Sequence, residues 1–264
     1  MSQRARERRY LRRYSERVTE VASANSAAIR NTASGPRACG AHQHEPRESQ
    51  IVESWVSNAT PWIMAVRERR IESRRLVTDA AIVELRHRAP RSILDVGCGE
   101  GWLARALASD AIEFHGVDAV PSLIEEARKA GGGSFQALSY EEIAAGALHV
   151  AVDLIVCNFC LFGKESVERL MPALTTLLRP GGAVIIQTLH PLISCGDLPY
   201  RSGWRDGTWA GIDGAFGPPA PWYFRTFESW MELLRASALR LTHLREPLHP
   251  KTLKPASMIF VAAV

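Results

Sequence analysis

Three alternating glycines give the clearest chemical signal in the sequence. Gly97, Gly99 and Gly101 lie in Asp95-Val96-Gly97-Cys98-Gly99-Glu100-Gly101, between a short apolar run and the pattern of a helix. Glycines lack a Cβ atom, so the backbone can come close to a ligand, and the first turn of the next helix offers unpaired N–H groups. The segment therefore predicts a ligand-binding loop.

Asp118 ends the next predicted strand, 21 residues after Gly97. A carboxylate at this place can accept hydrogen bonds from both hydroxyls of a ribose. The alternative is that it caps the helix that Pro121 opens. The dinucleotide fingerprint Gly-x-Gly-x-x-Gly does not fit, because residue 102 is Trp, so a nicotinamide-dependent oxidoreductase is disfavoured.

An alternation of strands and helices positions these residues. Apolar runs predict strands at 92–96, 114–117, 135–138, 153–157, 183–188, 239–244 and 258–264. Helices are predicted at 102–108, 165–178 and 227–236, with another from Pro121 to the glycines at 131–133. The order predicts an α/β fold with a doubly wound sheet.

The chain before the first strand divides at about residue 49. Residues 1–48 carry ten Arg and five Glu with few large apolar side chains, so we predict a basic, disordered tail. Residues 49–91 are predicted to form a helical cap, with helices beginning near Ile51, Pro61 and Leu76. Cys39, His42 and His44 are too few ligands for a convincing metal site, and we expect none.

The net charge of +4 is concentrated near the N-terminus. Residues 1–48 carry +5, residues 49–92 carry +3, and residues 93–264 carry −4. No apolar run is long enough for a membrane span, and no apolar run follows the Arg-rich start as a signal peptide requires. Five cysteines do not suggest a disulfide framework, so we expect a cytoplasmic protein without a membrane partner.

Taken together, these motifs resemble those of the class I S-adenosylmethionine-dependent methyltransferases. The matching segments are 94–101, 116–118, 153–159 and 178–182, in the order and spacing of the family. The resemblance covers about residues 92–264. It implies a mostly parallel, seven-stranded Rossmann-like methyltransferase sheet with a C-terminal antiparallel strand, and S-adenosylmethionine as cofactor.

The resemblance also implies which residues bind the cofactor. Asp95 and the backbone of 97–101 would hold its methionine end, Asp118 its ribose and Ala119 its adenine. The family often has an acid for the adenine amine, where this chain has Leu138 and Ser139, so a hydroxyl or a backbone group would serve. The implied set is Asp95, Gly97, Cys98, Gly99, Gly101, Asp118, Ala119, Leu138, Ser139, Asn158 and Phe159.

Arginines before the first strand are a further candidate for cofactor binding. Arg70 or Arg74 could pair bidentately with the carboxylate of the cofactor. The alternative is a solvated, charged helix face.

Residues 191–225 are predicted to form a lid loop after the fifth strand, followed by a C-terminal helix and hairpin in 226–264. Aromatic rings in the lid could shield the acceptor and favour a cationic sulfonium, or could pack the loop onto the sheet. The candidates for substrate contact are Trp62, Tyr200, Trp204, Trp209, Trp222 and Tyr223.

His190 directly follows the fifth strand and is the candidate general base. Ligands bind at the carboxyl edge of the strands in such folds, which is where this side chain is expected. It could instead hydrogen-bond the start of the loop, and methyl transfer can also proceed by proximity alone.

The leading hypothesis is methyl transfer to an oxygen, nitrogen or carbon of a small molecule by in-line displacement. The second is an RNA or tRNA methyltransferase that uses the Arg-rich arm, and the third is a non-catalytic cofactor-binding protein. Nucleic acid is disfavoured because residues 93–264 are acidic and no RNA-binding module is recognisable. The Asn-Pro-Pro-Tyr motif is absent, since Phe159-Cys160-Leu161 follows Asn158.

Overall fold

The computed structural model describes residues 45–71, 74–108, 111–249 and 252–264. The chain divides into two units, 1–43 and 44–264, and the fold described below belongs to the second. Cys39, His42 and His44 lie outside the described residues. Helix α2 begins at Glu45, four residues before the division predicted at residue 49.

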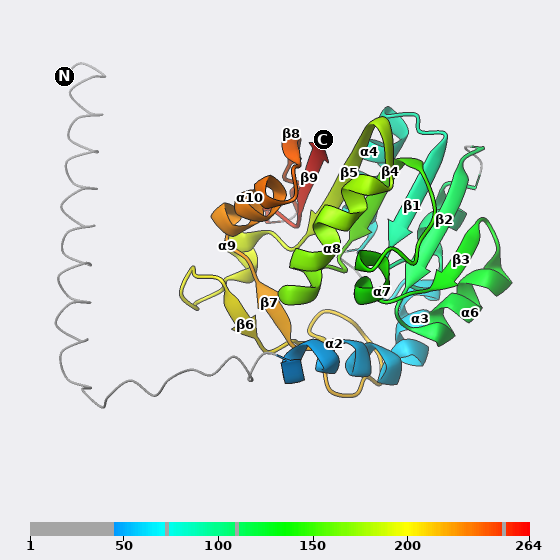
Figure 1. Ribbon diagram of the computed structural model, residues 1–264. Helices are drawn as coiled ribbons and strands as arrows, with labels where there is room; N and C mark the ends of the chain where they lie inside the picture. The colour runs from blue at the N-terminus through cyan, green and yellow to red at the C-terminus, as the bar shows by residue number, and fades with distance from the viewer. Residues whose placement is uncertain (1–44, 72–73, 109–110, 250–251) are drawn as a thin grey trace, which may run out of the picture. The chain divides into compact units, whose positions relative to one another are not determined.

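A seven-stranded sheet runs through this unit (Figure 1). Its order is β3-β2-β1-β4-β5-β9-β8; β1 to β5 run parallel, and β9 is antiparallel to both of its neighbours. This confirms the predicted fold class. The strands are β1 (Ser92–Val96), β2 (Glu113–Asp118), β3 (Ser134–Ala137), β4 (Val152–Asn158), β5 (Leu178–Thr188), β8 (Arg240–Arg245) and β9 (Met258–Ala263).

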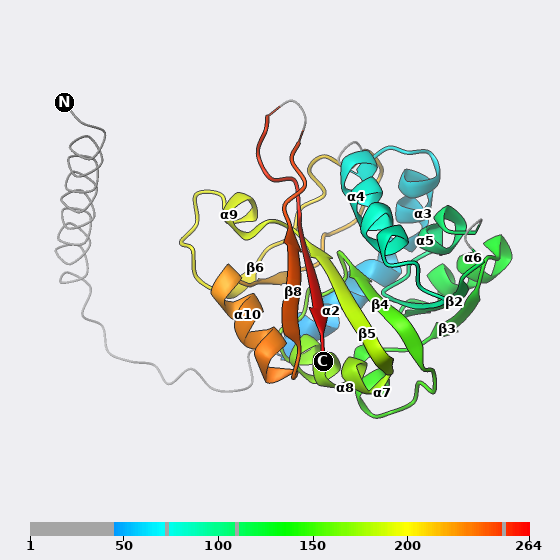
Figure 2. The ribbon, with the colours of Figure 1, turned by 90° about the horizontal axis from the view of Figure 1, so that it is seen from above.

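Helices cover both faces of the sheet (Figure 2). One face carries α4 (Arg74–His87), α5 (Trp102–Ala106) and α6 (Pro121–Ala130); the other carries α7 (Tyr140–Ala144), α8 (Glu165–Thr176) and α10 (Phe227–Ala236). Successive residues of β1 enter different cores, Ile93 on the α4 side and Leu94 on the α8 side. Burial on both faces explains why the central strands are continuously apolar.

The sheet order reverses between β1 and β4, because the chain builds outward from β1 through β2 to β3 and then returns to the other side of β1. In such sheets, ligands bind at the carboxyl ends of the strands beside this switch point. The glycine loop follows β1 and Asp118 ends β2, so both predicted binding elements lie at this edge.

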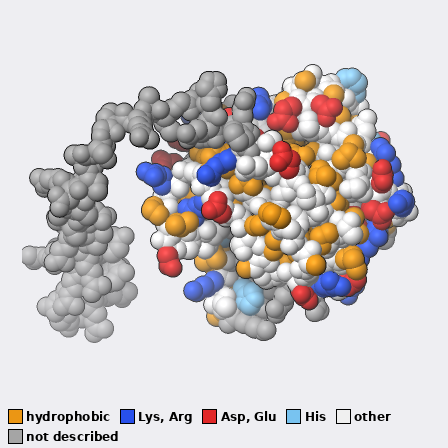
Figure 3. All heavy atoms as spheres, turned by 90° about the horizontal axis from the view of Figure 1, so that it is seen from below, with side chains coloured by type: hydrophobic (Ala, Val, Ile, Leu, Met, Phe, Trp, Pro, Cys, Tyr) orange, Lys and Arg blue, Asp and Glu red, His pale blue; other side chains and the backbone are white. Residues whose placement is uncertain are grey.

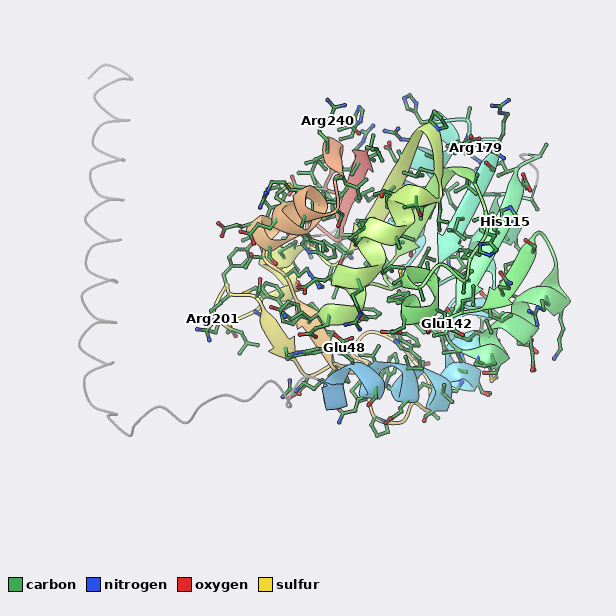
Figure 4. The ribbon with its side chains drawn as sticks, in the orientation of Figure 1. Glu48, His115, Glu142, Arg179, Arg201 and Arg240 are labelled. Atoms are coloured by element: carbon green, nitrogen blue, oxygen red, sulfur yellow. The ribbon has the colours of Figure 1, made fainter. Side chains whose placement is uncertain are left out.

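Helices α2 (Glu45–Ser57) and α3 (Ala59–Arg67) lie across the carboxyl edge (Figure 1). Glu48 joins α2 to the start of α8, where its Oε1 accepts hydrogen bonds from the backbone N–H of Lys164 at 2.7 Å and of Glu165 at 2.9 Å (Figure 4). The N-terminal N–H groups of a helix have no partner within the helix, so this carboxylate acts as a cap supplied from a distant segment.

Helix α3 is held over α6 by a small apolar cluster and an ion pair. Ala59 packs with Val120 and Leu123, and Arg67 Nη2 lies 2.9 Å from Glu126 Oε2. These contacts place the predicted helical cap beside the glycine loop.

The predicted lid is more ordered than a loop. It contains the short helix α9 (Pro191–Ser194) and a hairpin of β6 (Gly203–Arg205) and β7 (Trp222–Phe224). The prediction of loop for the whole of 191–224 was therefore wrong. The two strands are short and are separated by a segment rich in Gly and Pro, so their pairing leaves no periodic pattern in the sequence.

Two smaller differences concern the ends of elements, and a third is an additional helix. Helix α8 ends at Thr176, and β5 begins at Leu178 because Leu178 pairs with Val152 before a register shift. Helix α7 was not predicted, although Ser139 and Glu142 form the capping box that marks its start. Within the described ranges, no helix combines the length and apolarity needed to cross a membrane.

Candidate active site

The glycine loop takes a backbone shape that requires glycine. Gly97, Gly99 and Gly101 have φ of +71°, +56° and +79°, in the left-handed region. A Cβ at Gly97 would clash with Cys160, and one at Gly101 would lie 3.1 Å from the Cβ of Ala127. The space beside Gly99 is open up to the indole Nε1 of Trp62, 3.8 Å from the added Cβ position. Gly97 and Gly101 thus permit close packing, and Gly99 leaves room for a ligand.

Asp118 is joined to this loop by its carboxylate. Oδ2 accepts a hydrogen bond from the Gly99 N–H at 2.9 Å, and Oδ1 accepts one from the Val120 N–H at 2.9 Å. Burial raises the pKa of Asp118, while the two N–H groups act in the opposite direction. A carboxylate has about four acceptor positions, so two remain for the hydroxyls of a ribose.

The residues implied for the cofactor meet at one edge. The structure leaves Gly97, Gly99, Asp118, Ala119 and Leu138 only half-buried, whereas β1, which leads to the glycine loop, is buried throughout. This edge therefore has accessible backbone and a carboxylate with unused acceptor positions. The residues present fit an adenosine-containing cofactor.

Three members of the implied set, Asp95, Cys98 and Gly101, are buried more deeply. Asp95 lies within β1, opposite Gly116 of β2 and Val156 of β4. Cys98 is 1% exposed; its Sγ lies 3.6 Å from the carbonyl oxygen of Gly99, and burial raises the pKa of its thiol. The backbone N–H of Cys98 donates to the Val117 carbonyl at 3.0 Å, and its carbonyl accepts the Gly101 N–H at 3.1 Å, so both groups are used within the protein.

Ser139 is engaged in capping α7. Its hydroxyl accepts a hydrogen bond from the Glu142 N–H at 3.2 Å, and the Glu142 carboxylate accepts one from the Ser139 N–H at 2.8 Å. Next to it, the hydroxyl of Tyr140 donates to the carbonyl of Cys160 at 3.0 Å and joins α7 to the segment after β4. Tyr140 was not among the predicted site residues.

Asn158 ends β4 and begins a polar chain along the edge. Its Nδ2 donates to Oε1 of Gln187 at 2.8 Å, and Nε2 of Gln187 donates to the hydroxyl of Ser257 at 3.0 Å. Phe159 follows in the left-handed region with φ of +49°. The turn at the end of β4 is therefore held by hydrogen bonds across to β5 and to the segment that precedes β9.

Five aromatic rings cover the edge above the glycine loop, and we call them the aromatic cover. Trp55 lies at its centre, with centroid distances of 5.1 Å to Trp62, 5.5 Å to Trp209 and 6.2 Å to Phe162. Phe216 stacks on Trp209 at 4.4 Å. The rings come from α2, α3, the loop after β4 and the lid, and each is half-buried.

Asn58 fastens the lid to the N-terminal helices. It is fully buried; its Oδ1 accepts from the Gly217 N–H at 2.7 Å and its Nδ2 donates to the Pro218 carbonyl at 3.2 Å. Ser54 donates to the same carbonyl at 2.8 Å, and Trp209 Nε1 donates to the Gly217 carbonyl at 2.8 Å. The aromatic cover is thus held by hydrogen bonds as well as by ring contacts.

The predicted substrate residues fall into two groups. Trp62 and Trp209 belong to the aromatic cover. Trp204 and Tyr223 face each other across β6 and β7 at 5.6 Å, and Trp222 packs against Phe224. The hydroxyl of Tyr200 accepts a hydrogen bond from the N–H of Phe227 at the start of α10.

The hairpin of β6 and β7 is anchored by a buried cation. Arg225 donates to the carbonyls of Gly163 at 2.8 Å and Lys164 at 3.2 Å, and it lies near the rings of Tyr223 and Trp230. Burial lowers the pKa of this guanidinium. Tyr223 also donates its backbone N–H to the Phe162 carbonyl at 2.7 Å, so the hairpin is bound to the loop that carries Phe162.

The two candidate arginines are placed differently. Arg70 pairs with Glu68 two residues earlier, at the surface. Arg74 begins α4, and its side chain lies outside the described part of the chain.

His190 is buried at the start of α9, with 3% of its surface exposed. Its carbonyl accepts the N–H groups of Ile193 and Ser194, and its Nε2 lies 2.8 Å from Oε1 of Glu246. Its Nδ1 has no hydrogen-bond partner among the described residues. Glu246 gave no signal in the sequence, because it follows β8 in an otherwise irregular segment.

Three features are typical of Rossmann-like methyltransferases: the order of the strands in the sheet, the glycine loop after β1 and the acid that ends β2. Residues 66–246 match the family model described as a methyltransferase domain. The chain belongs to this family of class I S-adenosylmethionine-dependent methyltransferases. At the level of the family, the match confirms the predicted enzyme class and cofactor.

The curated relatives are similar to this chain over only part of their own length. The ubiquinone biosynthesis O-methyltransferase of Cupriavidus pinatubonensis is 33% identical over 106 residues, which are 39% of this chain and 43% of that protein. The corresponding protein of Burkholderia thailandensis is 32% identical over 108 residues, 39% of this chain and 47% of its own. The chain thus matches less than half the length of these relatives.

Two solved structures share the fold over most of both chains. The 1,6-didemethyltoxoflavin-N1-methyltransferase of Burkholderia thailandensis, with bound 1,6-didemethyltoxoflavin and S-adenosylhomocysteine, has a TM-score of 0.60 and 18% identity, covering 86% of this chain and 93% of its own. The magnesium protoporphyrin IX methyltransferase of Synechocystis, with bound S-adenosylhomocysteine, has a TM-score of 0.56 and 16% identity, covering 82% and 98%.

Proposed function

We propose that this chain transfers a methyl group from S-adenosylmethionine to a small, flat, largely apolar molecule by in-line displacement. The observation that carries the proposal is the aromatic cover, which reaches the glycine loop where Trp62 lies beside Gly99. Half-buried rings at a predicted cofactor edge are suited to stack on a planar acceptor and to exclude water from the reacting atoms.

Each part of the edge has a role in this proposal. The cofactor supplies an electrophilic methyl group on a positively charged sulfur. Asp118 would hold the ribose through its two remaining acceptor positions, and the open space beside Gly99 would admit the cofactor. The ring faces of the aromatic cover favour the positive charge and hold the acceptor in line.

The relatives give support of a general kind. The names of three relatives refer to small molecules. They mention ubiquinone biosynthesis, 1,6-didemethyltoxoflavin and magnesium protoporphyrin IX. We infer that the acceptor here is also a small molecule, and the aromatic cover favours a planar one.

The surface over the aromatic cover argues against RNA as acceptor. Figure 3 shows the face formed by α2, α3 and the lid, and apolar side chains are spread over the described part of its middle. Val52, Val56 and Met64 on the two helices are among the exposed apolar residues. An RNA-binding face would instead carry a continuous band of Lys and Arg for phosphate contacts.

A transfer assay with isotopically labelled methyl donor tests the proposal. Planar phenols and nitrogen heterocycles, aliphatic alcohols and amines, and total RNA are offered separately. We expect label in a planar small molecule, and lower transfer to it in Trp209→Ala than in the control Phe227→Leu outside the aromatic cover. Label in RNA alone would support the second hypothesis; cofactor binding without transfer to any fraction would support a non-catalytic protein.

A further inference from the structure

The pair of His190 and Glu246 brings together segments that are 56 residues apart. His190 follows β5 and Glu246 follows β8, and Nε2 lies 2.8 Å from the carboxylate. The imidazole is buried, while the side chain of Glu246 is 51% exposed. A solvent-exposed carboxylate gains little stability from such a pair, because water screens the interaction, so stability alone is a weak reason for the contact.

The carboxylate determines which ring nitrogen carries the proton. An ionised carboxylate only accepts hydrogen bonds, so Nε2 must be the donor, as Nε2–H. In the neutral ring, Nδ1 then carries the lone pair and can only accept. Glu246 thereby holds the ring in the form in which Nδ1 can take up a proton.

The free nitrogen is buried and has no partner among the described residues. Leaving a buried polar atom without a hydrogen bond is destabilising, so each such atom in a native structure calls for an explanation, and a catalytic role is one. Nε2 reaches toward β8, which lies on the far side of β9 from β5. The two nitrogens of the ring diverge, so Nδ1 faces away from the Glu246 carboxylate. His190 lies three residues after Gln187, which pairs with Asn158 at the end of β4.

We propose that Glu246 is a positioning residue that presents Nδ1 of His190 to the methyl acceptor, and that the reacting group of the acceptor is therefore a hydroxyl or an N–H. The inference rests on the proposed methyl transfer. The acceptor atom forms a bond to the methyl carbon, and the sulfur keeps the electron pair of the bond that breaks. The acceptor proton passes to Nδ1, and the resulting imidazolium is balanced by the carboxylate of Glu246.

The test combines a spectroscopic readout with kinetics on the full chain. Nitrogen-15 NMR of histidine-labelled protein reports which ring nitrogen is protonated, and the signal lost in His190→Gln identifies His190. Glu246→Gln keeps an oxygen that accepts from Nε2–H, whereas Glu246→Ala removes it. Glu232→Ala, on the exposed side of α10, is the matched control.

We expect His190 of the unmodified chain to show an unprotonated Nδ1 and a protonated Nε2 at neutral pH, with the same pattern in Glu246→Gln. In Glu246→Ala we expect this pattern to be lost and kcat to fall about 10- to 100-fold, with little change in KM, because only proton removal is affected. Glu246→Gln should recover most of the rate.

Two results would overturn the proposal: a protonated Nδ1 in the unmodified chain, or an unchanged kcat in Glu246→Ala. The NMR readout needs no methyl transfer, so it separates this proposal from the proposed function. If the expected proton pattern is found but no small molecule is methylated, the proposed function fails and the tautomer assignment stands. Methylation confined to acceptors without a hydroxyl or N–H leaves the proposed function standing and contradicts the role of Glu246 in proton removal.

Discussion

Oδ2 of Asp118 accepts a 2.9 Å hydrogen bond from the backbone N–H of Gly99. This bond connects the end of β2 to the loop after β1, beside the switch point of the sheet. It fixes the loop so that Gly99 stays open beneath Trp62. The same carboxylate thus organises the loop and keeps two acceptor positions for a ligand.

The first prediction concerns cofactor affinity. Asp118→Ala should weaken S-adenosylmethionine binding about 100-fold or more, because hydrogen bonds to a charged group are worth about 1.5–3 kcal/mol each and two are lost. Isothermal titration calorimetry measures the change. Glu125→Gln, an exposed acid on α6, should bind as the unmodified chain does. Equal affinity in Asp118→Ala and the control would remove Asp118 from the site.

The second prediction concerns the pH dependence of binding. Burial raises the pKa of Asp118, so the carboxylate gains its proton at a higher pH than an ordinary aspartate. The charged form makes the stronger hydrogen bonds to ribose. Cofactor affinity should therefore fall on acidification, beginning above the usual range for aspartate. Calorimetry at several pH values tests this, and Asp118→Asn should bind weakly without this fall.

In the absence of the cofactor, the raised pKa of Asp118 has the opposite pH effect on the stability of the fold: acidification stabilises it. A folded-state pKa above the unfolded value stabilises the fold at low pH, and this contribution is lost as pH rises through the folded pKa. The free chain thus carries a cost for the Asp118 carboxylate at neutral pH. Thermal unfolding should show a larger gain from added cofactor at neutral pH than in acid; equal gains would contradict the assignment.

The third prediction concerns the cap on α8. Glu48→Ala should lower the free energy of unfolding by about 1–3 kcal/mol, because it leaves the N–H groups of Lys164 and Glu165 and the hydroxyl of Ser166 without their acceptor. Denaturant titration measures it. Glu53→Ala, exposed on the same helix, should change stability by less than about 0.5 kcal/mol.

The fourth prediction concerns the attachment of the lid. Asn58→Ala removes the acceptor of the Gly217 N–H and the donor to the Pro218 carbonyl. Hydrogen exchange at Gly217 and proteolysis within 206–221 should become faster, and KM for the acceptor should rise more than the dissociation constant of the cofactor. Ser57→Ala is the control, since the hydroxyl of Ser57 bonds, within the described part of the chain, to the Glu53 carbonyl of its own helix. Unchanged exchange at Gly217 would contradict the role of Asn58.

The fifth prediction separates the acceptor classes by truncation. Deleting residues 2–43 should leave cofactor affinity and turnover of a small-molecule acceptor unchanged, with no new salt dependence. A deletion that extends through residue 48 should also cost stability, because it removes Glu48. Loss of transfer in the shorter deletion alone would favour the Arg-rich arm as a substrate-binding element.

Sequence reasoning predicted the sheet well, because buried parallel strands leave continuous apolar runs that contain few polar residues. The observed β1 and α10 coincide with the predicted 92–96 and 227–236. Contacts between distant segments were not predictable in this way. The sequence does not distinguish Glu48 from any other surface acid. The folded structure shows that it caps a helix that begins at residue 165.

The aromatic cover shows the same limit. Trp55 has helical spacing and reads as a core residue of an amphipathic helix, yet it contacts Trp62, Phe162 and Trp209 from three different segments. Glu246 had no periodic or motif signal at all. Motifs predicted the cofactor edge because backbone geometry demands particular residues there, whereas tertiary contacts determine the acceptor side.

The most direct measurement is transfer of labelled methyl from S-adenosylmethionine by the full chain into a metabolite extract, with total RNA from the same cells assayed in parallel. We predict that label enters the small-molecule fraction, that the labelled product is planar, and that Asp118→Ala abolishes the signal. Label confined to RNA, or no label in either fraction from a chain that binds the cofactor, would contradict small-molecule methylation.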